Sequence, residues 1–122
     1  MAARLRALRG ATTVEEDRAE HVTERVVALV REMLSRNGVS HDELVSILFT
    51  ATDDIHSVFP ATAARTIGLG DVPLICAREL DILGATPRCV RVMMHLYTDR
   101  ATSSLHHVYL EGARGLRDDL PE

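Results

Sequence analysis

The segment from Cys89 to Tyr97 alternates apolar and other side chains more regularly than any other part of the chain. Because successive side chains in a strand point to opposite faces, this period of two predicts a β-strand with one face in the core. A strand cannot bury that face alone, so the chain is expected to form a sheet. The apolar face carries Val90, Val92, Met94 and Leu96.

Between residues 15 and 38 the apolar residues recur instead at steps of three and four, which predicts a long amphipathic helix. Acidic residues at its start, Glu15, Glu16 and Asp17, suit the positive end of a helix dipole. The pair Asn37-Gly38 is a typical helix end. The apolar stripe, with which the helix can cover a sheet, consists of Val22, Val26, Leu29, Val30, Met33 and Leu34.

Shorter patterns complete the predicted order of elements. The order strand, long helix, strand, short helix and three strands favours an α+β fold, in which helices cover one face of a mixed β-sheet. Residues 1–122 are expected to form a single domain, with a loosely ordered C-terminal tail from about residue 112. Further strands are predicted at 4–9, 45–51, 72–76 and 107–110, a short helix at 61–67, and a helical turn after a capping box of Ser40 and Glu43.

Composition excludes several classes of function. All 14 basic residues are arginine, which excludes lysine Schiff-base chemistry and the lysine of a phosphate-binding loop. The formal net charge is −4 and the arginines are dispersed, so no nucleic acid is expected as a partner. No apolar run is long enough to cross a membrane, so no membrane is expected either. Cys76 and Cys89 form no CxxC pair, which favours the reducing cytoplasm.

The common catalytic signatures are missing from the sequence: the GxSxG elbow, the GxxxxGK[ST] loop, HExxH and GxGxxG. His106 and His107 are adjacent, so in a strand they would face opposite ways and could not chelate one metal; no metal site is predicted. Cys76, taken by itself, is interpreted as a small buried hydrophobic residue, because no histidine spacing identifies a base for a nucleophilic thiol.

Charged residues beside apolar strands are the most informative feature for function. Arg91 stands within the Cys89–Tyr97 strand, Glu79 follows another strand by three residues, and Arg9 ends the first strand. Each of them could be a solvated or salt-bridged surface residue. Together with a tyrosine they would instead suit a small anionic ligand, because a guanidinium fork matches carboxylate geometry. Composition does not choose between these two interpretations.

Six segments, in order along the chain, resemble the monofunctional chorismate mutases of the trimeric, pseudo-α/β-barrel class. They are 9–15 (RGATTVE), 51–61 (ATDDIHSVFPA), 72–76 (VPLIC), 79–81 (ELD), 89–94 (CVRVMM) and 107–111 (HVYLE). The match is collinear from about Leu8 to Leu120. The resemblance implies a homotrimer with active sites at subunit interfaces. It also implies the [3,3] rearrangement of chorismate to prephenate in aromatic amino acid biosynthesis, without a cofactor.

The resemblance implies a role for each matched residue. Arg91 would face the ether oxygen of the breaking bond, where negative charge develops in the transition state. Glu79 and Cys76 would contact the ring hydroxyl, on the side where the ring fragment becomes electron-poor. Arg9 and Tyr109 would hold a substrate carboxylate. The neighbouring subunit would contribute Phe59, Ala61 and Arg65, while Leu74 and Ile75 line the pocket and Leu116 and Arg117 belong to a closing tail.

Two positions depart from the pattern that the resemblance implies. Where the family commonly has a basic residue this sequence has Thr62, and Ile75 replaces a hydroxyl residue. Two other functions stay open at this point. One is a trimeric enzyme similar to the enamine/imine deaminases, which would activate water, and the other is a non-catalytic trimer that binds a metabolite of the aromatic pathway.

Overall fold

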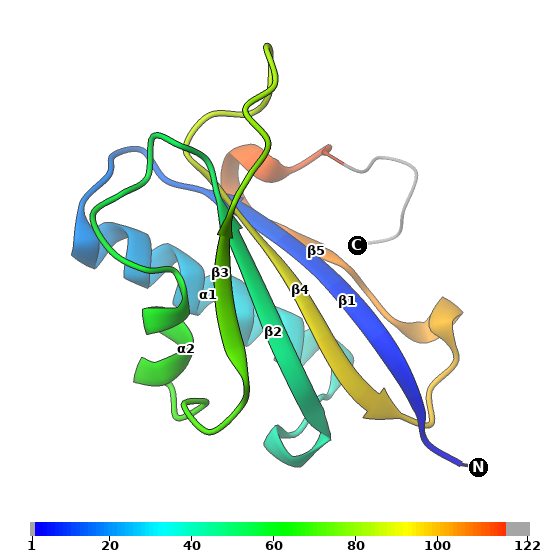
Figure 1. The fold of residues 1–122 in the computed structure, drawn as a ribbon. Coiled ribbons are helices and arrows are strands. Elements are labelled where there is room, and N and C mark those ends of the chain that lie inside the picture. Colours follow the sequence, from blue (N-terminus) through cyan, green and yellow to red (C-terminus); the bar gives the residue numbers. More distant parts are fainter. Residues whose placement is uncertain (1, 117–122) are drawn as a thin grey trace.

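A computed structural model describes residues 2–116 and has helices on one face of a five-stranded sheet, while the other face is uncovered (Figure 1). The predicted α+β class, with a mixed sheet and helices on one side, is therefore confirmed. Within the described residues, no helix is long and apolar enough to span a membrane. The elements are β1 (Arg4–Thr13), α1 (Ala19–Asn37), β2 (Leu44–Ala51), α2 (Ala61–Thr66), β3 (Leu74–Arg78), β4 (Cys89–Thr98) and β5 (Val108–Tyr109). Three short 3₁₀ helices are η1 (His41–Glu43), η2 (Thr102–Ser104) and η3 (Glu111–Ala113).

The strand order across the sheet is β3-β2-β4-β1-β5. The central strand β4 runs antiparallel to β1 and β2, while the outer strands β3 and β5 lie parallel to β2 and β1. The register places Thr50 opposite Arg91 and Arg9 opposite Met93. Since opposed residues share a face, all four side chains lie on the uncovered side of the sheet.

The core lies between the sheet and α1. From α1 it receives the predicted apolar stripe, and from β4 the alternate residues that begin at Val90. Strand β1 approaches α1 most closely at Gly10, where a Cβ atom would lie 2.5 Å from the sulfur of Met33. An alanine at this position would require the Met33 side chain to shift, so glycine lets the helix and the strand pack closely.

Several predicted boundaries were wrong, and tertiary pairing explains each of them. Strand β1 continues to Thr13 rather than ending at Arg9, because its last residues pair with β4 and β5. Strand β3 begins at Leu74 rather than Val72, because the Val72 amide closes a turn to Leu69 and Pro73 has no amide hydrogen. The capping box of Ser40 and Glu43 is confirmed.

The described part of the C-terminal segment packs against β1 through η3. In η3 the Gly112 amide donates to the Thr13 hydroxyl at 2.8 Å, and Ala113 is fully buried. The region from about residue 112, which was expected to be loosely ordered, therefore starts inside a packed 3₁₀ helix. Residues 117–122 of the expected tail lie outside the described residues.

Candidate active site

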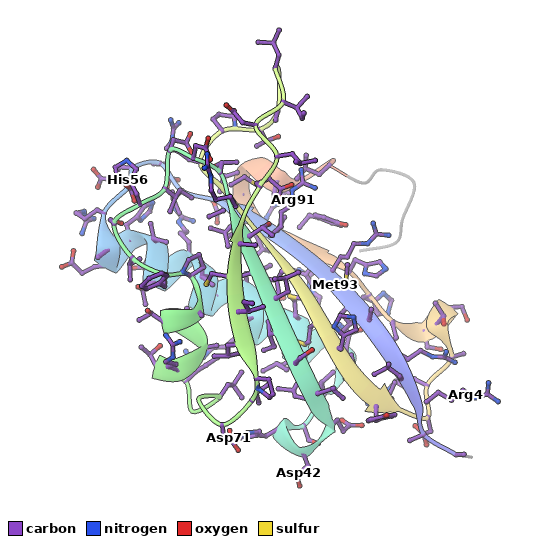
Figure 2. All side chains as sticks on the ribbon, in the orientation of Figure 1. Arg4, Asp42, His56, Asp71, Arg91 and Met93 are labelled. Carbon is purple, nitrogen blue, oxygen red and sulfur yellow. The ribbon has the colours of Figure 1, made fainter. Side chains whose placement is uncertain are left out.

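A cavity of about 240 Å³ opens on the uncovered face of the sheet. Figure 2 looks onto this face, where Arg91 and Met93 of β4 are labelled. The pairing of the strands brings together side chains that lie far apart in the sequence, and among them are the predicted Arg9, Glu79, Arg91 and Tyr109. Among the residues that the structure describes, the lining consists of Arg9, Gly10, Ala11, Leu48, Thr50, Glu79, Arg91, Val92, Met93 and Tyr109.

Opposite charges meet in the middle of this cavity. The Nε atom of Arg91 lies 3.6 Å from the Oε2 atom of Glu79, and the Thr50 hydroxyl donates a hydrogen bond of 2.6 Å to the same carboxylate oxygen. The Nε atom of Arg91 is buried and has no hydrogen-bond partner among the described residues. The Arg91 side chain as a whole is 42% exposed, so its outer end is open to a ligand at the cavity.

The thiol of Cys89 lies beneath this charged pair, at the start of β4. Burial raises the pKa of Cys89, and the nearby Arg91 guanidinium offsets this only in part. The thiol is therefore neutral near pH 7 and does not form an ion pair with the arginine. That charge remains available for an anionic ligand.

Tyr109 and Arg9 form the other end of the cavity. Tyr109, in β5, is buried in a small cluster with Ala11, Cys89 and Ala113, and Leu116 packs against this cluster. The predicted Leu116 is thus next to the cavity, in the segment that follows η3. The predicted Arg117 lies outside the described residues.

The other predicted residues do not join this cavity within one chain. A second cavity of about 720 Å³ lies between β3 and the loop that precedes α2, and its lining includes Phe59 and Cys76. Cys76 pairs with Phe49 of the core, so its side chain lies on the opposite side of β3 from Ile75. The expected grouping of Cys76 with Glu79 is therefore not found within one chain, because alternation along β3 directs Cys76 away from the uncovered face.

Of the residues expected to come from a neighbouring subunit or to line the pocket, three are solvent-accessible here. Phe59 is 71% and Ile75 64% exposed, and Arg65 is exposed on α2. Ala61 is buried in the core, and Leu74 packs partly against it.

Thr50 is a residue of the site that was not predicted from the sequence. The signal was present, since a hydroxyl residue stands at the end of the apolar run Ile47-Leu48-Phe49. A polar side chain in such a strand needs a hydrogen-bond partner, and Glu79 provides it. What could not be seen is that Thr50 lies in β2 and that Glu79 directly follows β3, the strand parallel to β2.

A guanidinium, a carboxylate and a phenol in one small cavity define a protein that binds a compact, anionic small molecule. A comparison with protein families then identifies the kind of enzyme. Residues 5–120 match the family described as "Chorismate mutase type I", so the chain belongs to that family and is an isomerase.

Individual relatives agree with this assignment. The chain is 45% identical to the chorismate mutase AroH of Thermus thermophilus over 117 residues, which are 95% of this chain and 96% of that protein. It is 40% identical to the chorismate mutase AroH of Bacillus subtilis (strain 168) over 117 residues, or 95% and 92% of the two chains. A solved chorismate mutase from Clostridium thermocellum superposes with a TM-score of 0.88 at 42% identity, covering 89% of this chain and 97% of that one. The predicted family resemblance is confirmed.

Proposed function

We propose that this enzyme converts chorismate to prephenate in the cavity that holds Arg9, Glu79, Arg91 and Tyr109. In this [3,3] rearrangement an ether C–O bond breaks while a C–C bond forms, and no atom enters or leaves the substrate. The observation that carries the proposal is the ion pair of Arg91 and Glu79, 3.6 Å apart in a site of substrate size. The transition state separates charge, so a site with one fixed positive and one fixed negative group is complementary to it.

Arg91 is proposed to face the ether oxygen of the breaking bond. Negative charge grows on this oxygen in the transition state, and donors already fixed in place stabilise it without reorganisation. The central strand β4 holds the backbone of Arg91, and Glu79 holds its Nε end. The rest of the guanidinium can therefore bind the substrate in a defined orientation.

Glu79 is proposed to lie near the ring hydroxyl, where the ring fragment becomes electron-poor. A carboxylate on that side stabilises the positive charge, as Arg91 stabilises the negative charge on the other. The hydrogen bond from Thr50 fixes one carboxylate oxygen at 2.6 Å. Thr50 is thus a positioning residue for Glu79.

Arg9 and Tyr109 are proposed to bind a substrate carboxylate. Chorismate is a dianion, which explains why a protein of net charge −4 places two arginines in one cavity. A guanidinium can bind a carboxylate through two parallel hydrogen bonds, which fixes orientation as well as charge. Holding the substrate in a compact conformation is itself a large part of catalysis for a unimolecular reaction.

We further propose a homotrimer in which the cavity of one chain faces the second cavity of its neighbour. The separation of the predicted residues into two groups on one chain supports this, since Phe59 and Cys76 lie away from Arg91 and Glu79. The neighbour would contribute Phe59, Ala61 and Arg65, with Phe59 as an apolar wall. Leu74 and Ile75 would line the pocket through side chain or backbone.

Two residues at the C-terminal side are proposed to complete the site. Leu116, packed beside Tyr109, would close the cavity on one side, and Arg117 would follow it over the ligand.

The cytoplasm is the proposed compartment, because Cys76 and Cys89 are free thiols. The product would serve the biosynthesis of phenylalanine and tyrosine.

One assay tests the reaction. Purified enzyme is mixed with chorismate, its absorbance is followed, and the product is identified by NMR. We expect prephenate as the single product, a large loss of rate in Arg91→Ala, and no ammonia release from enamine or imine substrates. Binding of prephenate without any turnover of chorismate would refute the proposed reaction and leave a binding protein.

A further inference from the structure

The backbone amide of Arg9 needs an acceptor that the sheet does not supply. Strand β5 consists of only Val108 and Tyr109, which pair with Gly10 and Ala11 of β1. The Arg9 amide lies one position before this pairing. It donates instead to the imidazole Nδ1 atom of His107 at 2.9 Å. The side chain of His107 thereby extends the hydrogen bonding of the sheet edge by one residue.

This contact defines the chemical form of the imidazole. A backbone amide is always a donor, so Nδ1 must offer its lone pair, and the ring is neutral with its proton on Nε2. An imidazolium would point an N–H group at the Arg9 amide and would lose the hydrogen bond. The contact therefore requires an acceptor at this position of the side chain, and not merely a ring of suitable size.

The segment that carries His107 is itself tied to the end of α1. The buried Asn37 side chain accepts from the His106 amide at 2.6 Å and donates to the His106 carbonyl at 2.9 Å. The same Asn37 amide group also donates to the Met33 carbonyl at 2.8 Å. These bonds fix the backbone directly before His107 to the helix, so the imidazole is presented from a rigid base.

Arg9 is also restrained on its other sides. It pairs with Met93 of β4, and the adjacent Gly10 packs closely against the Met33 side chain of α1. The hydrogen bond to His107 is thus the third restraint on a backbone position that α1 and β4 already confine. Its side chain leaves this position toward the cavity.

We propose that His107 is a positioning residue for Arg9, and that its neutral Nδ1 sets the direction in which the Arg9 guanidinium enters the cavity. The inference rests on the proposed role of Arg9 in binding a substrate carboxylate. A two-point guanidinium–carboxylate contact depends on angle as well as distance. Loosening the backbone at Arg9 therefore weakens substrate binding in the ground state and in the transition state alike.

Three substitutions of His107 separate the acceptor from the bulk of the ring. In His107→Asn the Oδ1 atom occupies the place of Nδ1 and accepts the same hydrogen bond, whereas His107→Gln moves the oxygen one bond further out. His107→Leu keeps comparable volume and has no acceptor. His41→Leu is the control for losing an imidazole, since His41 is exposed and pairs with Asp71 on the surface.

The expected result is a rise of about fivefold to tenfold in KM for chorismate in His107→Leu and His107→Gln, the scale of one lost hydrogen bond, with a smaller change in kcat. His107→Asn and His41→Leu should stay within about twofold of wild type. Equal KM values in all four variants would overturn the inference. The inference would also be overturned if His107→Asn and His107→Leu lost kcat and thermal stability to the same extent, because equal losses indicate a structural role only.

NMR of the wild-type enzyme tests the hydrogen bond without activity or substitution. In uniformly ¹⁵N-labelled protein at neutral pH we expect a scalar coupling between the Arg9 amide nitrogen and His107 Nδ1, and an Nδ1 shift typical of an unprotonated nitrogen. A protonated Nδ1 would overturn the inference. If the wild type does not convert chorismate, the proposed function fails while this measurement still decides the positioning contact.

Discussion

The Oε2 atom of Glu79 lies 3.6 Å from the Nε atom of Arg91, although Glu79 follows β3, Arg91 belongs to β4, and β2 separates these two strands. Thr50 of β2 lies between them and donates to the same carboxylate oxygen that faces Arg91. The arginine is 42% exposed, and solvent-exposed ion pairs contribute only about 0–1 kcal/mol to stability. The arrangement is therefore better explained by the charges that a bound substrate develops than by a requirement of folding.

Arg91→Lys is expected to lose most of kcat although the positive charge is kept. A compact ammonium cannot place the planar donors of a guanidinium at the ether oxygen. The expected loss of transition-state stabilisation is about 3 kcal/mol, the scale of removing one such donor. Steady-state kinetics with chorismate measures it, and thermal unfolding checks that stability is preserved. An unchanged kcat with a raised KM would make Arg91 a ground-state binder and contradict the role proposed here.

Thr50→Val is expected to reduce kcat by about fivefold to tenfold, because Glu79 loses the hydroxyl that orients its carboxylate. Thr50→Ser keeps the hydroxyl and serves as the matched control, with activity close to wild type. Both variants are compared by kcat and KM. If Val and Ser behave alike, the hydroxyl does not position Glu79.

Mixed trimers test the shared site. Arg91→Ala and Phe59→Ala chains, each weakly active alone, are refolded together at equal amounts. If each site combines the Arg91 cavity of one chain with the Phe59 cavity of its neighbour, about a quarter of the sites carry both native halves, and activity returns to about that fraction. Sedimentation equilibrium should give three chains per particle. A fully active monomer would contradict the interface model.

Cys76→Ser is expected to remain substantially active, because the rearrangement passes through no covalent intermediate. No proton is transferred either, so kcat should be nearly constant across neutral pH and show no solvent isotope effect. Rates measured in H₂O and D₂O over this range provide the test. A bell-shaped profile with a clear isotope effect would favour the water-activating deaminase reaction instead.

Asp17 links the entry of α1 to the loop before α2. The Ser57 side chain, together with the backbone amides of His56 and Ser57, holds the pKa of Asp17 below its usual value of 3.8. A carboxylate whose pKa is lowered on folding stabilises the folded state above its unfolded pKa, and this contribution is lost as the pH falls through the folded pKa.

Asp17→Asn should therefore lower the thermal unfolding midpoint at neutral pH and flatten its decline below about pH 4. Asp42→Asn, a change at an exposed residue of η1, is the matched control and should follow the wild-type curve. Unfolding midpoints at several pH values measure both effects. If the unfolding midpoints of Asp17→Asn and of wild type change with pH in parallel, Asp17 does not contribute to the pH dependence of stability.

Much of the fold could be predicted because it depends on short-range periodicity. The alternation in β4 and the three- and four-residue steps in α1 require only that one face be apolar, and the structure uses those faces for the core. The ends of β1 and β3 could not be predicted, because they are decided by partners distant in the sequence. Gly10–Thr13 has no strand-like pattern of its own and becomes a strand by pairing with β4.

The candidate site, like the fold, could be predicted only in part from the sequence. The residue types, Arg9, Glu79, Arg91 and Tyr109, could be named from the sequence through its resemblance to a family, and the structure gathers them in one cavity. Thr50 and His107 acquire their contacts only when β2 meets β3 and when β5 meets β1.

Composition and periodicity were sufficient to predict the class of fold, the apolar faces and the absence of lysine chemistry. Which polar groups meet depends on the tertiary arrangement, and this arrangement separates Cys76 from Glu79 although they are three residues apart. The physical reason is that a strand alternates its faces with every residue, so neighbours in sequence can serve opposite sides of the sheet. The pairing of β5 with β1, in contrast, brings Arg9 and His107 together across almost the whole length of the chain.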